Sequence, residues 1–198
     1  MTKTNNIHTA IERIVAMDYL SIIDKYYAGQ EELKSLLLQH SRQVADKALA
    51  VCTAHPEWKV DKTFVEEAAM LHDIGIVYCD APRINCHGNE PYIRHGIIGA
   101  ELLRKEGLPK HARVAERHTG SGLSAKEIEE QQLPLPRQDY LPESLEERII
   151  CYADKFYSKS HPLREENVSN IRRKMENFGE ESLQRWLQLE YEMTTKSN

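Results

Sequence analysis

Residues 69–76 read AMLHDIGI and place an imidazole beside a carboxylate at the end of an apolar run. Asp61 is expected to cap the helix that leads into this stretch, because its short side chain can accept a hydrogen bond from the first turn. Gly75 is expected to help end the helix, as glycine commonly does just beyond a helix C-terminus. Taken alone, His72 and Asp73 indicate only a capped helix end with its polar groups in water.

Apolar residues recur at helical intervals on both sides of this stretch, and no segment alternates convincingly as a β-strand would. The sequence therefore predicts an all-α fold. Residues 76–94 break the helical pattern with two prolines and a glycine, and connections of this length are commonly lids or binding loops. Helices are expected over residues 7–27, 30–54, 61–74, 95–107, 109–118, 124–131, 144–160, 164–177 and 180–193.

Length and composition bound the class of protein. The 198 residues suit a single domain, and hydrophobic and charged fractions of 40% and 29% are those of a soluble globular chain. The 26 basic and 31 acidic residues leave a net charge of -5, so neither nucleic acid nor a membrane is expected as a partner. The polar N-terminus and the lack of a long apolar segment predict a cytoplasmic protein.

Several histidines and aspartates occupy core-facing or helix-terminal positions. His40 lies one turn from both Leu36 and Val44, so it shares the apolar stripe of its helix. Asp154 follows Ile150 by one turn, and a buried carboxylate without a cationic partner costs several kcal/mol. The other members of this set are His72, Asp73, His95 and His118.

Each of these residues alone is more often a hydrogen-bonded core residue or a chance pair than a metal ligand. Their joint occurrence in an all-α chain favours a metal site instead, since only nine histidines are present in total. Neutral imidazole and carboxylate are ligands that suit divalent metals such as zinc, iron, manganese and magnesium.

The order His40, then His72-Asp73 within a complete HDIG sequence, then Asp154 resembles the ligand pattern of the HD superfamily of metal-dependent phosphohydrolases. His95 in YIRHGIIGAELL and His118 in AERHTGSG stand where the two-metal branch of that superfamily places two further ligands. The resemblance covers about residues 33–158. It implies an HD-domain helical bundle within a single domain, 1–198, with flanking helices 7–27 and 164–193 packed on the core.

The resemblance also implies a phosphohydrolase that cleaves a phosphoester or phosphoanhydride of a small metabolite or nucleotide. Asp73 would bridge two divalent ions (iron, manganese, zinc, cobalt or magnesium), and it is the expected centre of catalysis. His40, His72 and Asp154 would complete the first site, while His95 and His118 would complete the second. Two ions about 3.5–4 Å apart would activate a bridging water for in-line attack on phosphorus.

Two cations are candidates for binding the substrate phosphate. Lys155 directly follows Asp154 and is also a catalytic candidate, and Arg83 lies in the long connection. Both are equally explained as surface charges, because lysine and arginine are mostly exposed. The last two helices could form a homodimer contact. Two other functions stay open, namely an HD-fold mixed-valence diiron oxygenase with the same ligands and a ligand-binding module that retains metal.

Overall fold

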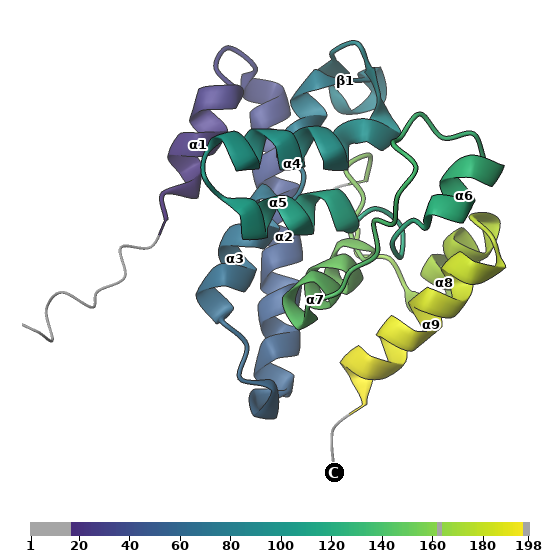
Figure 1. Cartoon of the computed structure of the whole chain (residues 1–198). Coiled ribbons are helices and arrows are strands. Elements are labelled where there is room, and N and C mark those ends of the chain that lie inside the picture. The colour runs from purple at the N-terminus through teal and green to yellow at the C-terminus, as the bar shows by residue number, and fades with distance from the viewer. Residues whose placement is uncertain (1–16, 162–163, 196–198) are drawn as a thin grey trace, which may run out of the picture.

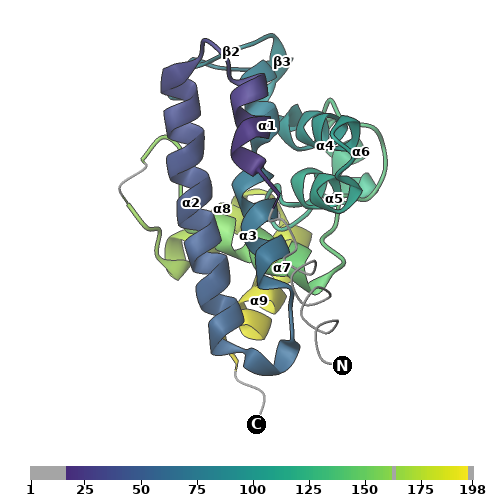
Figure 2. The ribbon, with the colours of Figure 1, turned by 90° about the vertical axis from the view of Figure 1, so that its left-hand side faces the viewer.

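The computed structural model describes residues 17–161 and 164–195, and these form the all-α fold that the sequence predicts. Helix α2 (Glu31–Ala54) runs along most of the length of the molecule (Figure 2). Helices α3 (Lys62–Leu71) and α7 (Leu145–Asp154) pack against it. No helix in the described ranges has both the length and the apolar composition needed to cross a membrane.

The remaining helices cover this central group. Helix α4 (His95–Lys105) packs along α5 (Pro109–Arg117), and α5 in turn contacts both α3 and α7 (Figure 1). The short helix α6 (Ala125–Glu130) leads toward the C-terminal pair. Helices α8 (Val168–Asn177) and α9 (Glu180–Thr194) pack on each other, on the side of the molecule away from α1 (Tyr19–Tyr26) (Figure 1).

Local sequence explains where several helices begin. The Asp61 carboxylate accepts a hydrogen bond of 3.1 Å from the Phe64 amide, which confirms the predicted cap of α3. Ser144 and Glu147 form a reciprocal capping box at the start of α7, because each side chain bonds to the other's backbone amide. These contacts fix the starting points of α3, which leads directly to His72, and of α7, which ends at Asp154.

Three predicted helices differ most in extent from the observed ones. Helix α1 (Tyr19–Tyr26) accounts for the end of the segment predicted as 7–27, whose residues 7–16 lie outside the described ranges. Helix α7 ends at Asp154 instead of 160, because its final turn tightens to three-residue hydrogen bonds and the chain then leaves the helical path. Helix α8 begins only after Asn167, whose side chain caps it.

The connection 76–94 contains a small sheet, so the expectation of no strand was wrong for this segment. Strand β1 (Cys79–Ala81) pairs antiparallel with β2 (Cys86–His87) and parallel with β3 (Glu90–Pro91). Strands of two or three residues are too short to show an alternating pattern, which explains why the sequence conceals them. Short 3-10 helices lie between and around them, at Ile74–Tyr78, Pro82–Ile84 and Tyr92–Arg94.

Gly75 does not end α3 as predicted, because the helix already stops at Leu71 and Gly75 lies within the following 3-10 helix. A Cβ atom at this position would collide with the carbonyl oxygen of His95 and the amide nitrogen of Gly99, both in α4. Glycine therefore allows the chain after Asp73 to lie directly on the first turn of α4.

Two hydrophobic clusters meet along α2. One cluster contains Val44 and extends through α3 and α7 to Trp186 of α9. The other contains Leu37 and joins α1 with α4 and α5. His40 lies between Leu37 and Val44 on the same helix, so a buried polar residue separates the two apolar regions.

Candidate metal centre

Six buried polar side chains from different helices meet at one place. His40 is in the middle of α2, while Asp154 is the last residue of α7. The other four stand at helix ends, where side chains can turn inward without interrupting a helix. All six have exposed fractions of 8% or less, and the four at helix ends are His72, Asp73, His95 and His118.

The first group consists of two histidines and two aspartates. His40 Nε2 lies 3.0 Å from Asp154 Oδ1 and 3.1 Å from Asp73 Oδ2. His72 Nε2 lies 3.0 Å from the same Asp73 oxygen and 3.4 Å from Asp154 Oδ1. The potential ligand atoms of these four residues all lie within 4.8 Å of one another.

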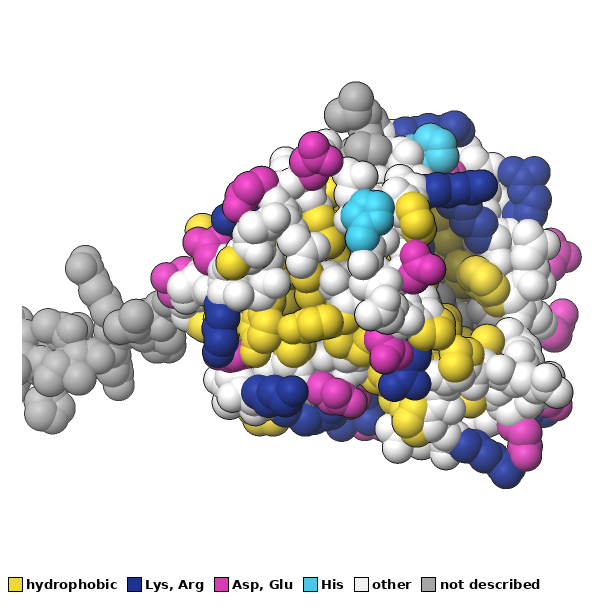
Figure 3. Space-filling view, turned by 90° about the horizontal axis from the view of Figure 1, so that it is seen from above, with side chains coloured by type: hydrophobic (Ala, Val, Ile, Leu, Met, Phe, Trp, Pro, Cys, Tyr) yellow, Lys and Arg dark blue, Asp and Glu magenta, His cyan; other side chains and the backbone are white. Residues whose placement is uncertain are grey.

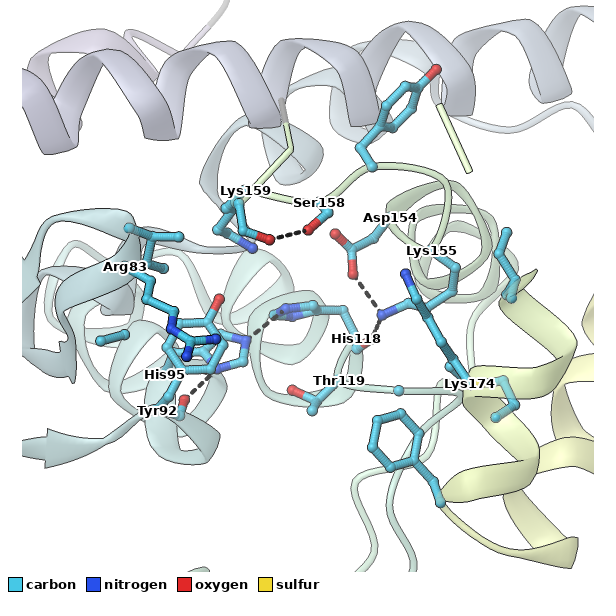
Figure 4. Close-up of a pocket in the computed structure, with 18 residues that line it drawn as sticks. Arg83, Tyr92, His95, His118, Thr119, Asp154, Lys155, Ser158, Lys159 and Lys174 are labelled. Carbon is cyan, nitrogen blue, oxygen red and sulfur yellow. Dashed lines mark hydrogen bonds and ion pairs between the residues drawn. The ribbon is translucent and has the colours of Figure 1, made fainter. Parts of the chain in front are cut away.

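The second group uses the other oxygen of Asp73. Asp73 Oδ1 lies 3.4 Å from Nε2 of both His95 and His118. These two imidazole nitrogens are 3.1 Å apart (Figure 4). Asp73 therefore faces one group with each carboxylate oxygen, which is the arrangement expected of a bridging ligand.

Backbone carbonyls fix the orientation of three of the rings. Nδ1 of His72 bonds to the Ala69 carbonyl at 2.6 Å, and Nδ1 of His95 and His118 bond to the carbonyls three residues before them, each at 2.7 Å. A ring that donates its Nδ1 proton to a carbonyl presents Nε2 to a metal, which is the usual outer contact of a metal-bound histidine.

The electrostatics of the second group favour a cation. Burial lowers the pKa of His95 to about 3 and also lowers the pKa of His118, so both rings are neutral at physiological pH. With their protons on Nδ1, the two Nε2 atoms present lone pairs toward each other at 3.1 Å. Lone pairs at this distance repel unless a cation binds both.

The first group is also suited to a cation. Burial alone would raise the pKa of Asp73, but Lys159 and the surrounding histidines hold it well below its usual range. Burial alone would lower the pKa of His72, but Asp73 and Asp154 raise it to about 9. Nε2 of His72 and both oxygens of Asp73 form no hydrogen bond of good geometry within the described residues. The donor set therefore fits divalent metals that accept nitrogen and oxygen ligands.

A pocket of about 440 Å³ opens onto this cluster. Lys155, one of the two predicted substrate residues, lines it and donates hydrogen bonds to Asp154 Oδ2 at 2.6 Å and to the His118 carbonyl at 3.1 Å. The other, Arg83, lines the pocket near Tyr92 (Figure 4), and no ion pair joins it to any other described residue. The structure therefore brings both predicted cations to one cavity.

Sequence reasoning missed Lys159. Its ammonium group forms an ion pair with Asp73 Oδ2, and its side chain is only 11% exposed. A helix continuing to residue 160 would place Lys159 about 140° around the axis from Asp154, on a different face. The spacing of five residues between Asp154 and Lys159 therefore did not indicate that they lie close together. Only the early end of α7 brings Lys159 to the cluster.

The other side of the pocket is apolar and comes from α8. Ile171 and Met175 are buried there, while Phe178 just after the helix is 53% exposed. Lys174 lies on the same wall, where it forms an ion pair with Glu166 at 3.3 Å. From above, the molecule shows a hollow in which hydrophobic side chains lie beside lysine and arginine side chains (Figure 3).

Comparison with known proteins agrees with this geometry. The model of the HD domain family matches residues 37–158. An uncharacterized protein of Methanocaldococcus jannaschii is 40% identical over 121 residues, which is 60% of this chain and 64% of that protein. No solved structure gives a significant match.

Two further relatives are named tRNA (cytidine(56)-2'-O)-methyltransferase. The protein from Picrophilus torridus is 31% identical over 154 residues, which is 77% of this chain and 39% of the relative. The protein from Thermoplasma volcanium is 31% identical over 157 residues, or 78% of this chain and 40% of the relative. The chain thus spans less than two thirds of the length of each of these three relatives. The family match covers more than half of the chain and includes all six clustered residues, so this chain belongs to the HD domain family.

Proposed function

We propose that this chain is a metal-dependent phosphohydrolase that acts on a small phosphorylated metabolite or nucleotide. The observation that carries the proposal is the pocket in which three cationic side chains lie beside the cluster of carboxylates and imidazoles. A pocket with this charge attracts an anion toward groups that can hold metal. The three cations are Arg83, Lys155 and Lys159, whereas Lys174 lies on the opposite wall and pairs with Glu166.

The residues of the cluster have distinct roles in this proposal. His40, His72 and Asp154 would hold one divalent ion, His95 and His118 a second, and Asp73 would serve both. Bound divalent ions supply Lewis acidity and a water of lowered pKa. Lys155 orients Asp154 through its hydrogen bond to Oδ2, which leaves Oδ1 facing the two histidines of the first group.

The shape of the pocket supports a substrate larger than phosphate itself. Its volume of about 440 Å³ lies in the range of pockets that bind small organic ligands. The three cations line the pocket together with the cluster, whereas Met175 and Phe178 form an apolar wall. A phosphate ester with a flat or apolar organic part suits both surfaces. The methyl transfer named for two relatives belongs to proteins of which this chain covers about two fifths, and it is not proposed here.

The proposal is tested by assaying release of inorganic phosphate from a panel of phosphomonoesters, nucleotides and dinucleoside polyphosphates. Protein stripped with a chelator is supplied separately with manganese, iron, cobalt, magnesium or zinc, with and without oxygen. We expect metal-dependent and oxygen-independent hydrolysis of at least one compound. Asp154→Asn should abolish it, whereas His111→Ala, which removes a buried histidine outside the cluster, should retain it. Phosphate release that persists in Asp154→Asn, or turnover that consumes oxygen without releasing phosphate, would contradict the proposal.

A further inference from the structure

We propose that Lys159 binds the phosphoryl group of the substrate once metal is present, and that its ammonium group competes with the metal for Asp73. This inference rests on the proposed function, because it names a substrate-binding residue of the same site. Lys159 lies beyond the segment matched by the family model, which ends at residue 158. It was not among the residues that the sequence pattern identified.

The position of Lys159 is defined by its contact with the first group. Its Nζ pairs with Asp73 Oδ2, the same oxygen that lies 3.1 Å from His40 Nε2 and 3.0 Å from His72 Nε2. The ammonium and both imidazoles therefore share one carboxylate oxygen. A buried carboxylate needs a cationic partner, and Lys159 supplies one to Asp73.

A divalent ion held by His40 and His72 would need the same oxygen of Asp73. The ion and the ammonium are both positive, and repulsion between like charges is strong in a site of low dielectric constant. Metal binding should therefore release Lys159 from Asp73. The four-carbon stem of lysine permits such a movement without a change in the backbone.

A released Lys159 side chain can move into the pocket, because it already lines that pocket. It is not held within a helix, and its neighbours Ser158 and Ser160 line the same cavity. Tyr92 also stands at the pocket wall, near Arg83 (Figure 4). A released ammonium group there would carry three donors toward a phosphoryl oxygen next to the metal.

Lys155 differs from Lys159 in a way that makes the inference specific. Its ammonium contacts Asp154 Oδ2 and the His118 carbonyl, whereas the cluster uses Asp154 Oδ1. Metal binding therefore does not conflict with the contacts of Lys155, which can stay in place as a positioning residue. Of the two lysines, Lys159 alone competes with metal for a ligand atom.

The first test measures binding of manganese and of inorganic phosphate to Lys159→Met, which keeps the stem and removes the charge. We expect the stripped variant to bind manganese about tenfold more tightly than wild type, and the loaded variant to bind phosphate about tenfold more weakly. Lys174→Met is the matched control, because Lys174 lines the same pocket but pairs with Glu166. It should change manganese binding little. Unchanged or weaker manganese binding by folded Lys159→Met would overturn the proposal.

A second test uses wild-type protein, so it does not depend on the folding of a variant. The rate at which an amine-reactive reagent labels Lys159 is followed by mass spectrometry, with Lys155 as an internal reference. Manganese should increase labelling of Lys159, and inorganic phosphate added afterwards should reduce it. A labelling rate of Lys159 that does not change on addition of manganese, or does not change on addition of phosphate, would overturn the proposal. If both changes occur but no phosphate ester is hydrolysed, the proposed reaction fails while Lys159 remains an anion-binding residue.

Discussion

At the scale of single residues, Asp73 is the one side chain that both groups share. Its Oδ2 faces His40 and His72, and its Oδ1 faces His95 and His118. The other clustered residues each belong to only one group. The two groups are therefore coupled through a single carboxylate.

This sharing predicts the effect of Asp73→Asn, which replaces one carboxylate oxygen with an amide group that is a poor ligand. Both sites should be weakened, and activity should fall by more than about a hundredfold, the loss that outer contacts of a metal ligand alone can cause. Metal content and phosphate release are measured on the same preparation. A variant that keeps one tightly bound metal and near wild-type turnover would show that Asp73 does not bridge.

The six clustered residues could be predicted from the sequence because residue type, order and helical position all carried information. His40 shows this best, since its spacing from Leu36 and Val44 places it on a buried face without any structure. Lys159 could not be predicted, because its position depends on where α7 ends and on the path of the chain beyond. Periodicity describes helices but not the segments that leave them.

At the scale of elements, the packing of the HDIG segment on α4 positions the second group. Gly75 touches the backbone of α4 at His95 and Gly99, so any side chain there would push the two segments apart. His95 is the first residue of α4. Close packing at Gly75 is therefore needed to keep His95 near Asp73.

We accordingly predict that Gly75→Ala weakens the second site. The variant should lose about 1–3 kcal/mol of stability from overpacking and should bind the second metal less tightly. Thermal unfolding and metal titration measure the two effects. Gly29→Ala is a suitable control, because it has open space around it and its cost comes only from a φ of 77°. Equal metal binding by the two variants would count against this role of Gly75.

Helix α8 gives the pocket its apolar wall, and its last turn leads to the half-exposed Phe178. Phe178→Ala should raise KM several-fold for phosphate esters with a flat or apolar group, while kcat changes little. The reason is that Phe178 would contact the substrate equally in the ground state and in the transition state. Tyr191→Ala removes an exposed aromatic residue outside this pocket and serves as control. A fall in kcat without a change in KM would assign Phe178 to another role.

At the scale of the whole molecule, the fold class followed from helical periodicity, and most helix positions agree with it. Helix α2 was predicted over 30–54 and is observed over Glu31–Ala54. The small sheet within 76–94 was not predicted, because each strand is only two or three residues long. The pocket itself could not be predicted, since it is formed by this connection, the chain beyond α7 and α8 together.

The number of metal ions bound per chain tests the central claim most directly. Protein stripped with a chelator is titrated with manganese, and the bound metal is counted by element-resolved analysis. We predict two ions for wild type, one for folded His118→Ala, and two for the control His111→Ala, whose histidine is buried outside the cluster. One ion in wild type, or two in His118→Ala, would contradict the assignment of a two-metal centre.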